Sequence, residues 1–161
     1  MGKRIIWETE NFVVLLPERP HIPREDGGHI CITTKEHYTD RTELPPALAT
    51  ELIRLSQITG IAYKKALSDG GVTVSRINYQ ENGNWAFRNG NSYPPFFHLH
   101  LYGRTEDSGS QEWGQALRFP DPDTGYYDGF SGLTEEDLAA FSKYMTELSA
   151  SEAFSEEKYR L

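Results

Sequence analysis

A strict alternation of side chains in the run Phe-Phe-His-Leu-His-Leu-Tyr-Gly-Arg at residues 96–104 constrains this chain more than any other feature. Successive side chains of a β-strand point to opposite faces of the sheet. One face of this strand is therefore apolar and can pack into a core. The opposite face carries His98, His100 and Tyr102, and two aligned imidazoles on a rigid strand indicate a site.

The histidine pair has three readings. Both rings can be partly exposed strand residues whose neighbours satisfy them. They can ligate a metal, but the candidates for a further ligand stand at no spacing that declares a metal site; these are His21, His29, His37 and Cys31. The third reading is nucleophilic catalysis, in which an imidazole nitrogen attacks phosphorus and its neighbours orient it.

Composition restricts the classes of protein to which the chain can belong. Its 161 residues suit one domain with a single core. The lack of a long apolar run, the N-terminus without a signal-peptide pattern and the single cysteine favour the cytoplasm and no membrane partner. The formal charge of −8 argues against duplex nucleic acid as a partner but not against a small anionic ligand.

Hydrophobic patterning predicts an α+β fold, with a mostly antiparallel sheet of five or more strands, one long helix packed on it and a helix near the C-terminus. Strands are expected at 5–7, 12–16, 29–34, 72–79 and 97–104, with a hairpin arm at 85–87. The long helix begins near Pro45-Pro46 and ends at Gly70-Gly71, and the second follows a capping box at Thr134 and Asp137.

Two regions lack a sustained pattern. Residues 103–132 are irregular and rich in aromatic side chains, which suggests that they pack onto the body of the protein or onto a partner. The tail from Ser149 to Leu161 is polar and is expected to fray.

In this order of elements, the chain resembles the histidine triad (HIT) family of nucleotide hydrolases and transferases. Gly28 to His37 is similar to the strand-turn-helix block of that family, and Pro20 to Pro23 is similar to the proline pair before it. Phe97 to Arg104 resembles the triad motif itself. The resemblance implies a single HIT-like domain over 1–161, with its core at about 4–104 and with an irregular loop, a helix and a tail over 105–161.

The resemblance also implies a reaction. His100 would attack the α-phosphate of a nucleotide derivative, such as a phosphoramidate or a dinucleoside polyphosphate, and form a nucleotidyl-histidine. His98 would support the orientation of the nucleophile, and Tyr102 takes the place of the third histidine of the motif. The chemistry requires no metal and no cofactor.

The resemblance places further residues against the substrate. His29 matches a position near the site, and the apolar residues Phe12, Val14 and Leu16 are candidates for the cleft that holds the base. The phosphate-binding run departs from the family pattern, so its nearest polar candidates here are Arg88, Asn91 and Ser92. Glu18 lies next to the place of the acid that contacts the ribose. His37 is interpreted as structural, and no chemistry is assigned to His21.

The replacement at Tyr102 leaves alternatives open. A phenol, with an ordinary pKa of about 10, donates a hydrogen bond but carries no positive charge near neutral pH. The chain is therefore interpreted as a nucleotide hydrolase or transferase, with a catalytically weakened nucleotide-binding module as one alternative and a metal-dependent enzyme as another. The expected partners are a small nucleotide and, from the resemblance, a second copy of the chain in a homodimer.

Overall fold

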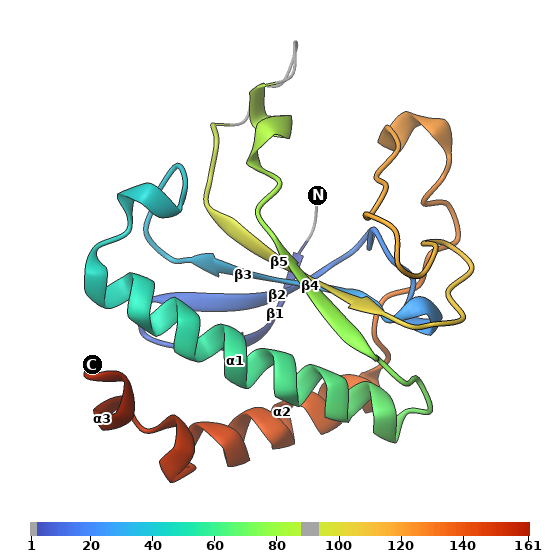
Figure 1. Ribbon diagram of the computed structural model, residues 1–161. Coiled ribbons are helices and arrows are strands. Elements are labelled where there is room, and N and C mark those ends of the chain that lie inside the picture. Colours follow the sequence, from blue (N-terminus) through green and yellow to red (C-terminus); the bar gives the residue numbers. More distant parts are fainter. Residues whose placement is uncertain (1–2, 88–93) are drawn as a thin grey trace.

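The computed structural model describes residues 3–87 and 94–161, and five antiparallel strands form its sheet in the order β1-β2-β3-β5-β4 (Figure 1). The strands are β1 (Lys3–Glu8), β2 (Phe12–Pro17), β3 (His29–Thr34), β4 (Arg76–Gln80) and β5 (His98–Arg104). The helices are α1 (Pro46–Asp69), α2 (Glu135–Ser149) and α3 (Glu156–Tyr159). Short 3-10 helices cover Arg24–Asp26, Arg41–Glu43, Gly83–Phe87, Pro122–Thr124 and Glu152–Phe154. No helix in these ranges is long and apolar enough to cross a membrane.

Both long helices lie on one side of the sheet, and the orange segment around residue 115 lies towards the other side (Figure 1). Leu99 and Leu101 of β5 belong to the core beneath α1, as the alternation predicts. The opposite side chains of β5 therefore face away from the helices. Because β3 pairs with β5 in the register Cys31↔His100, the side chains of β3 flank the histidines directly.

The α+β class, the five-stranded sheet, the long helix and the C-terminal helix with its capping box are confirmed. Three details of the prediction are wrong. The segment at 85–87 belongs to a 3-10 helix and not to a hairpin arm. The strand after α1 begins at Arg76, because Val72 and Val74 fill the core without pairing in the sheet. The tail does not fray; it forms α3 and accepts a hydrogen bond of 2.6 Å from Arg54 Nε at the Phe154 carbonyl.

The loop between β2 and β3, residues 18–28, is held in place by a partly buried ion pair. The Asp137 carboxylate caps α2 at its N-terminus and also accepts hydrogen bonds from Arg24 Nε at 2.5 Å and from Arg24 Nη2 at 2.8 Å. Arg24 Nη2 also donates to the Gly70 carbonyl at the end of α1. One guanidinium thus joins this loop to both long helices.

The same loop touches β5 through glycine. Gly27 has a φ of +116°, and its backbone lies directly on that of Gly103, whose N–H donates to the Gly28 carbonyl at 3.1 Å. The Tyr63 hydroxyl donates to the Gly27 carbonyl at 2.6 Å from α1. A side chain at position 103 would collide with the loop, so glycine here permits the contact between the loop and the strand.

We predict that Gly103→Ala destabilises the fold, because the new methyl group would overlap the Gly27 carbonyl. The expected loss in the free energy of unfolding is about 1–3 kcal/mol, as for other overpacked sites. Gly109→Ala is the matched control, since no atom lies within 4 Å of a Cβ at that position. Urea denaturation measures both variants, and equal midpoints would contradict the prediction.

Candidate functional site

The histidine face of β5 forms the floor of a pocket of about 360 Å³, called the histidine pocket below. Strands β2, β3 and β5 contribute to its lining, together with the N-terminal end of β1 and the segments around residues 19–21, 82–86 and 94–96. Its lining residues are Lys3, Pro17, Arg19, His21, His29, Cys31, Thr33, Asn82, Gly83, Trp85, Ala86, Pro94, Phe96, His98 and His100.

Charge in the histidine pocket is opposite to the charge of the chain. The whole sequence carries 24 acidic and 16 basic side chains. The described lining contains Lys3 and Arg19 but no carboxylate, although Arg19 also forms an exposed ion pair with Asp128 at 3.3 Å. A local excess of cations beside an apolar wall is the arrangement that an anionic ligand with an aromatic part requires.

A chain of hydrogen bonds runs under the pocket floor. The backbone N–H of His21 donates to His29 Nδ1 at 3.2 Å, and His29 Nε2 lies 2.8 Å from His100 Nδ1. Because His29 Nδ1 accepts a hydrogen bond, the neutral ring carries its proton on Nε2. His100 Nδ1 accepts that proton, so in this arrangement the neutral His100 ring carries its own proton on Nε2, the nitrogen that faces a ligand.

Cys31 can accept a hydrogen bond from the other tautomer of His100, in which the proton is on Nδ1. Its Sγ lies 3.1 Å from His100 Nδ1 and 3.3 Å from His29 Nε2. Burial raises the pKa of this thiol to about 12, so the sulfur stays protonated and acts as a weak acceptor. In the His100 tautomer whose Nδ1–H donates to this sulfur, the lone pair of Nε2 is free, and the hydrogen bond from His29 Nε2 is not made.

Burial keeps the imidazoles of the site neutral. Desolvation lowers the pKa of His100 well below its ordinary value of 6.5, and the nearby rings of His98 and His21 lower it further. Desolvation and the neighbouring His100 do the same to the pKa of His29. A neutral imidazole keeps its lone pair at pH 7, which is the state that both a nucleophile and a proton acceptor need.

His98 is oriented by its own strand. Its Nδ1 donates to the Phe96 carbonyl at 2.7 Å, and its ring stands edge-on to that of His100 with the centroids 4.5 Å apart. Desolvation lowers the pKa of His98 despite that hydrogen bond. The ring of His98 therefore presents Nε2, without a proton, beside the nucleophile candidate.

The structure brings His29, His98 and His100 together in the histidine pocket, but Tyr102 does not line it. Tyr102 lies on the same face of β5 and is fully buried. Its ring is covered by Phe119, at a centroid distance of 4.8 Å. Arg88, Asn91 and Ser92 lie outside the described residues.

The prediction that Phe12, Val14 and Leu16 line the cleft for the base is wrong, because these side chains lie on the other face of β2. Phe12 and Val14 are fully buried in the core with Leu16 packed against it, on the side of the helices, so none of the three lines the pocket. Pro17, one residue further on, is the residue of β2 that does. Glu18 is exposed and is not among the lining residues.

No sequence pattern indicated several of the lining residues, among them His21, Lys3, Arg19 and Trp85. One signal for His21 was available. The glycine pair at 27–28 marks a reversal of the chain directly before His29, and such a reversal brings the preceding loop back over the strand. The rings of His21 and His29 are indeed stacked, with their centroids 4.7 Å apart.

The aromatic segment at 103–132 packs onto the body of its own chain. The ring of Tyr127 lies 5.4 Å from that of His21, and Phe119 covers Tyr102. Asp26 holds the segment by accepting from the backbone N–H groups of Gly109 and Ser110, at 3.1 and 2.7 Å. Among the described residues, both faces of β5 are thus covered, and His98 and His100 line the histidine pocket.

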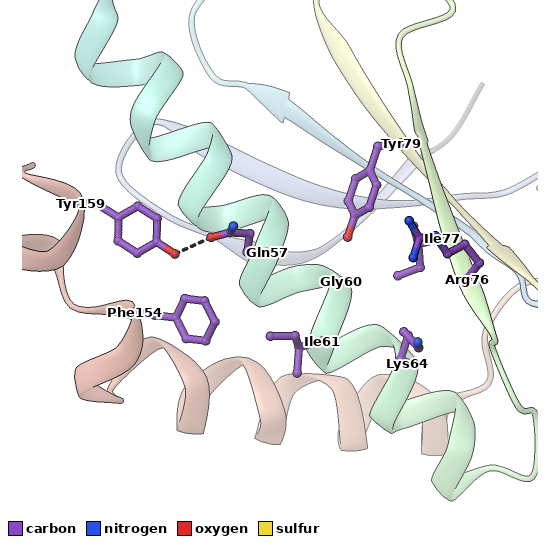
Figure 2. Close-up of a pocket in the computed structure, with 9 residues that line it drawn as sticks. All are labelled: Gln57, Gly60, Ile61, Lys64, Arg76, Ile77, Tyr79, Phe154 and Tyr159. Atoms are coloured by element: carbon purple, nitrogen blue, oxygen red, sulfur yellow. Dashed lines mark hydrogen bonds between the residues drawn. The ribbon is translucent and has the colours of Figure 1, made fainter.

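A second, larger depression of about 610 Å³ lies between α1, β4 and the C-terminal residues (Figure 2). Figure 2 shows the Tyr159 hydroxyl pointing at Gln57, to which it is hydrogen-bonded. Lys64, Arg76 and several apolar side chains complete its lining, which contains no histidine, cysteine or carboxylate. Its described lining holds no imidazole or thiol, so the histidine pocket is the candidate site despite its smaller volume.

Comparisons with known proteins test the fold. No protein-family model matches the sequence, and no curated protein matches it. Solved structures do match. A hypothetical histidine triad nucleotide-binding protein from Sulfolobus tokodaii has 15% identity and a TM-score of 0.59, over 92% of this chain and 87% of that one.

Two further structures agree. A Hit-like protein involved in cell-cycle regulation from Bartonella henselae has 14% identity and a TM-score of 0.55, over 89% of this chain and 87% of that one. A zinc-bound histidine triad family protein from Mycobacterium smegmatis has 22% identity and a TM-score of 0.53, over 94% of this chain and 90% of that one. The chain therefore has the fold of histidine triad proteins, as its motifs predicted.

We predict that the free energy of unfolding decreases as the pH falls from 7.5 to 5.5. Histidines whose native pKa lies below 6.5 take up protons in the unfolded chain first, so their contribution is complete above pH 6.5 and is lost below it. Each such histidine contributes a slope of up to about 1.4 kcal/mol per pH unit. Urea denaturation across this range should give a smaller slope for His100→Gln, and an unchanged slope would contradict the prediction.

Proposed function

We propose that the chain is a nucleotide hydrolase or nucleotidyl transferase that acts at the α-phosphate of a phosphoramidate or a dinucleoside polyphosphate. One observation carries the proposal. His100 is a buried, neutral imidazole that is held through Nδ1, with Nε2 left for a ligand, on the floor of a pocket whose described lining has two cations and no carboxylate. This is the arrangement that a histidine nucleophile for an anionic phosphorus centre needs.

The reaction has two displacements. In the first, His100 Nε2 attacks the α-phosphorus, the new N–P bond forms and the bond from phosphorus to the leaving group breaks, with its electron pair going to the leaving group. An amine leaving group also takes up a proton from water. In the second, water attacks the same phosphorus, the N–P bond breaks, and a nucleoside monophosphate and one proton are released. A different acceptor in place of water makes the protein a transferase.

The residues around His100 have separate roles in this proposal. Lys3 and Arg19 attract the phosphates, and the surfaces of Trp85 and Phe96 suit a base. His98 packs edge-on against His100 and orients the ring of the nucleophile. His29 and Cys31 both contact His100 Nδ1. The His100 tautomer that attacks carries its proton on Nδ1 and donates it to Cys31 Sγ, in place of accepting a hydrogen bond from His29 Nε2.

The metal-dependent alternative has a possible ligand set in His21, His29 and His100, each of which offers a ligand atom within 4.8 Å of the others. The set does not fit a resident metal. A histidine that ligates a metal donates a hydrogen bond from its other ring nitrogen. His29 Nδ1 instead accepts one from the backbone N–H of His21. We derive no step through a metal.

The catalytically weakened module stays a second candidate because of one observation, the absence of Tyr102 from the pocket lining. If the third position of the motif contributes nothing to the reaction, the protein would bind nucleotides and turn them over slowly. Affinity for adenosine monophosphate without release of product from adenosine phosphoramidate or diadenosine polyphosphate would favour this candidate.

We predict that His100→Ala abolishes nucleotidyl transfer while the fold is retained. The imidazole lies opposite Leu99 and Leu101, so its removal opens no cavity in the apolar core. Turnover should fall to less than about a thousandth of the wild-type value, as for other nucleophile deletions. A covalent nucleotidyl-enzyme, quenched in alkali because its P–N bond is acid-labile, should form in the wild type and not in the variant.

A chelator serves as the control for metal chemistry, since wild-type turnover should survive dialysis against it. Circular dichroism verifies that the variant is folded. A folded His100→Ala protein that retains half or more of wild-type turnover would exclude His100 as the nucleophile.

We also propose a homodimer, and place its contact at α1 and β4. Strand β4 is an edge of the described sheet, and Ile53, Ile61 and Tyr79 are exposed beside it. An unpaired edge next to exposed apolar side chains favours association with a second copy. Residues 103–132 are a weaker candidate for the dimer contact, because their aromatic side chains mostly pack against residues of the same chain.

Light scattering at micromolar protein should therefore give twice the chain mass. Ile61→Glu should reduce the mass to that of one chain, whereas Trp113→Ser, at an exposed aromatic residue of the other region, should leave it unchanged. A monomer mass for the wild type would reject the dimer.

A further inference from the structure

We propose that His21, a loop residue outside the strand motif, donates a hydrogen bond to the phosphoryl group under transfer, and that Tyr102 is a positioning residue that holds His21. The inference rests on the proposed function and deepens it. The sequence pattern puts Tyr102 at the third motif position, against the phosphoryl group, and assigns no role to His21. In this proposal His21 contacts the phosphoryl group, and Tyr102 supports His21.

The Tyr102 hydroxyl has no proton left to donate to an anionic ligand. It accepts a hydrogen bond from Asn82 Nδ2 at 3.0 Å and lies 2.9 Å from His21 Nδ1, to which it donates its only proton. The side chain is fully buried and is not part of the pocket lining. Burial also raises the pKa of the phenol, so its proton stays in place at neutral pH.

His21 meets the requirements that Tyr102 does not. Because its Nδ1 accepts the phenol proton, the neutral ring carries its own proton on Nε2, which makes Nε2 a donor. Its side chain lines the histidine pocket. Its ring lies 5.7 Å from that of His100 between centroids, and the two rings offer ligand atoms within 4.8 Å of each other.

The surroundings fix this ring on several sides. It stacks on His29, at a centroid distance of 4.7 Å, and Phe119 and Tyr127 pack against it at 5.3 and 5.4 Å. Desolvation, with a smaller effect from His98, lowers the pKa of His21 to about 4. The ring is therefore a preorganised neutral donor that stabilises charge on the phosphoryl oxygens and keeps its proton throughout the reaction.

A double-mutant cycle with single-turnover nucleotidylation separates the two roles. His21→Ala should slow the step ten- to hundredfold, the loss typical of one hydrogen bond to a charged group. His21→Gln, which keeps an N–H donor, should recover most of that loss. Tyr102→Phe should cost less than His21→Ala, and the double variant His21→Ala/Tyr102→Phe should be no slower than His21→Ala alone, because Tyr102 acts only through His21.

Tyr144→Phe is the matched control. It removes a hydroxyl hydrogen bond to Asp69 on the helix side of the fold, and should leave the rate unchanged. Nitrogen-15 NMR reports the tautomer of the His21 ring, which a change in fold stability alone does not alter. The wild-type ring should carry its proton on Nε2, and Tyr102→Phe should allow the other tautomer.

The outcomes that overturn the proposal are specific. A wild-type rate in His21→Ala overturns it, and so do losses that multiply in the double variant, since Tyr102 would then contact the substrate itself. If the wild type forms no nucleotidyl-enzyme, the proposed function has failed and equilibrium binding of adenosine monophosphate tests the His21 contact alone. His21→Ala should then weaken binding at least fivefold, and unchanged affinity or no binding in the wild type overturns the contact.

Discussion

The contact between the backbones of Gly27 and Gly103 is the constraint on which the site depends. It allows the loop at 18–28 to lie directly on β5, with the Gly103 N–H donating to the Gly28 carbonyl. Two residues further on, β3 begins in register with β5, so that His29 pairs with Tyr102. The loop histidine, the β3 histidine and the β5 histidine therefore converge because two chain segments approach more closely than any side chain would permit.

Burial then decides the chemistry of these converging groups. The aromatic segment after β5 closes over the histidine face, and the resulting desolvation holds the pKa values of His29 and His100 below their ordinary range. A strand with one face in water would leave the same imidazoles partly protonated near neutral pH and would blunt their nucleophilicity. Cations are supplied from the rim instead, by Lys3 and Arg19, which explains how a chain with a charge of −8 presents a pocket suited to an anion.

The parts of this architecture that were predictable are those that one segment determines by itself. Alternation along β5 assigns His98 and His100 to one face, and the capping box at Thr134 marks the start of α2. Alternation fails where both faces of a strand are covered. In β2, Phe12 and Val14 alternate correctly, but periodicity does not say which face meets the helices, and the cleft was assigned to the wrong one. His21, Lys3 and Arg19 reach the site by tertiary contact, for which a single segment holds no pattern.

The replacement of a motif histidine by Tyr102 changes the site less than the motif alone suggests. A phenol at this position is longer than an imidazole, and here its hydroxyl extends to the loop. There it donates a hydrogen bond to His21 Nδ1. The imidazole that β5 lacks at this position is thus available from the loop, in a ring stacked on His29. Such an exchange requires only that the loop already lies on the strand, as the Gly27–Gly103 contact ensures. A missing motif residue therefore does not establish a missing functional group when a neighbouring segment is close enough to supply it.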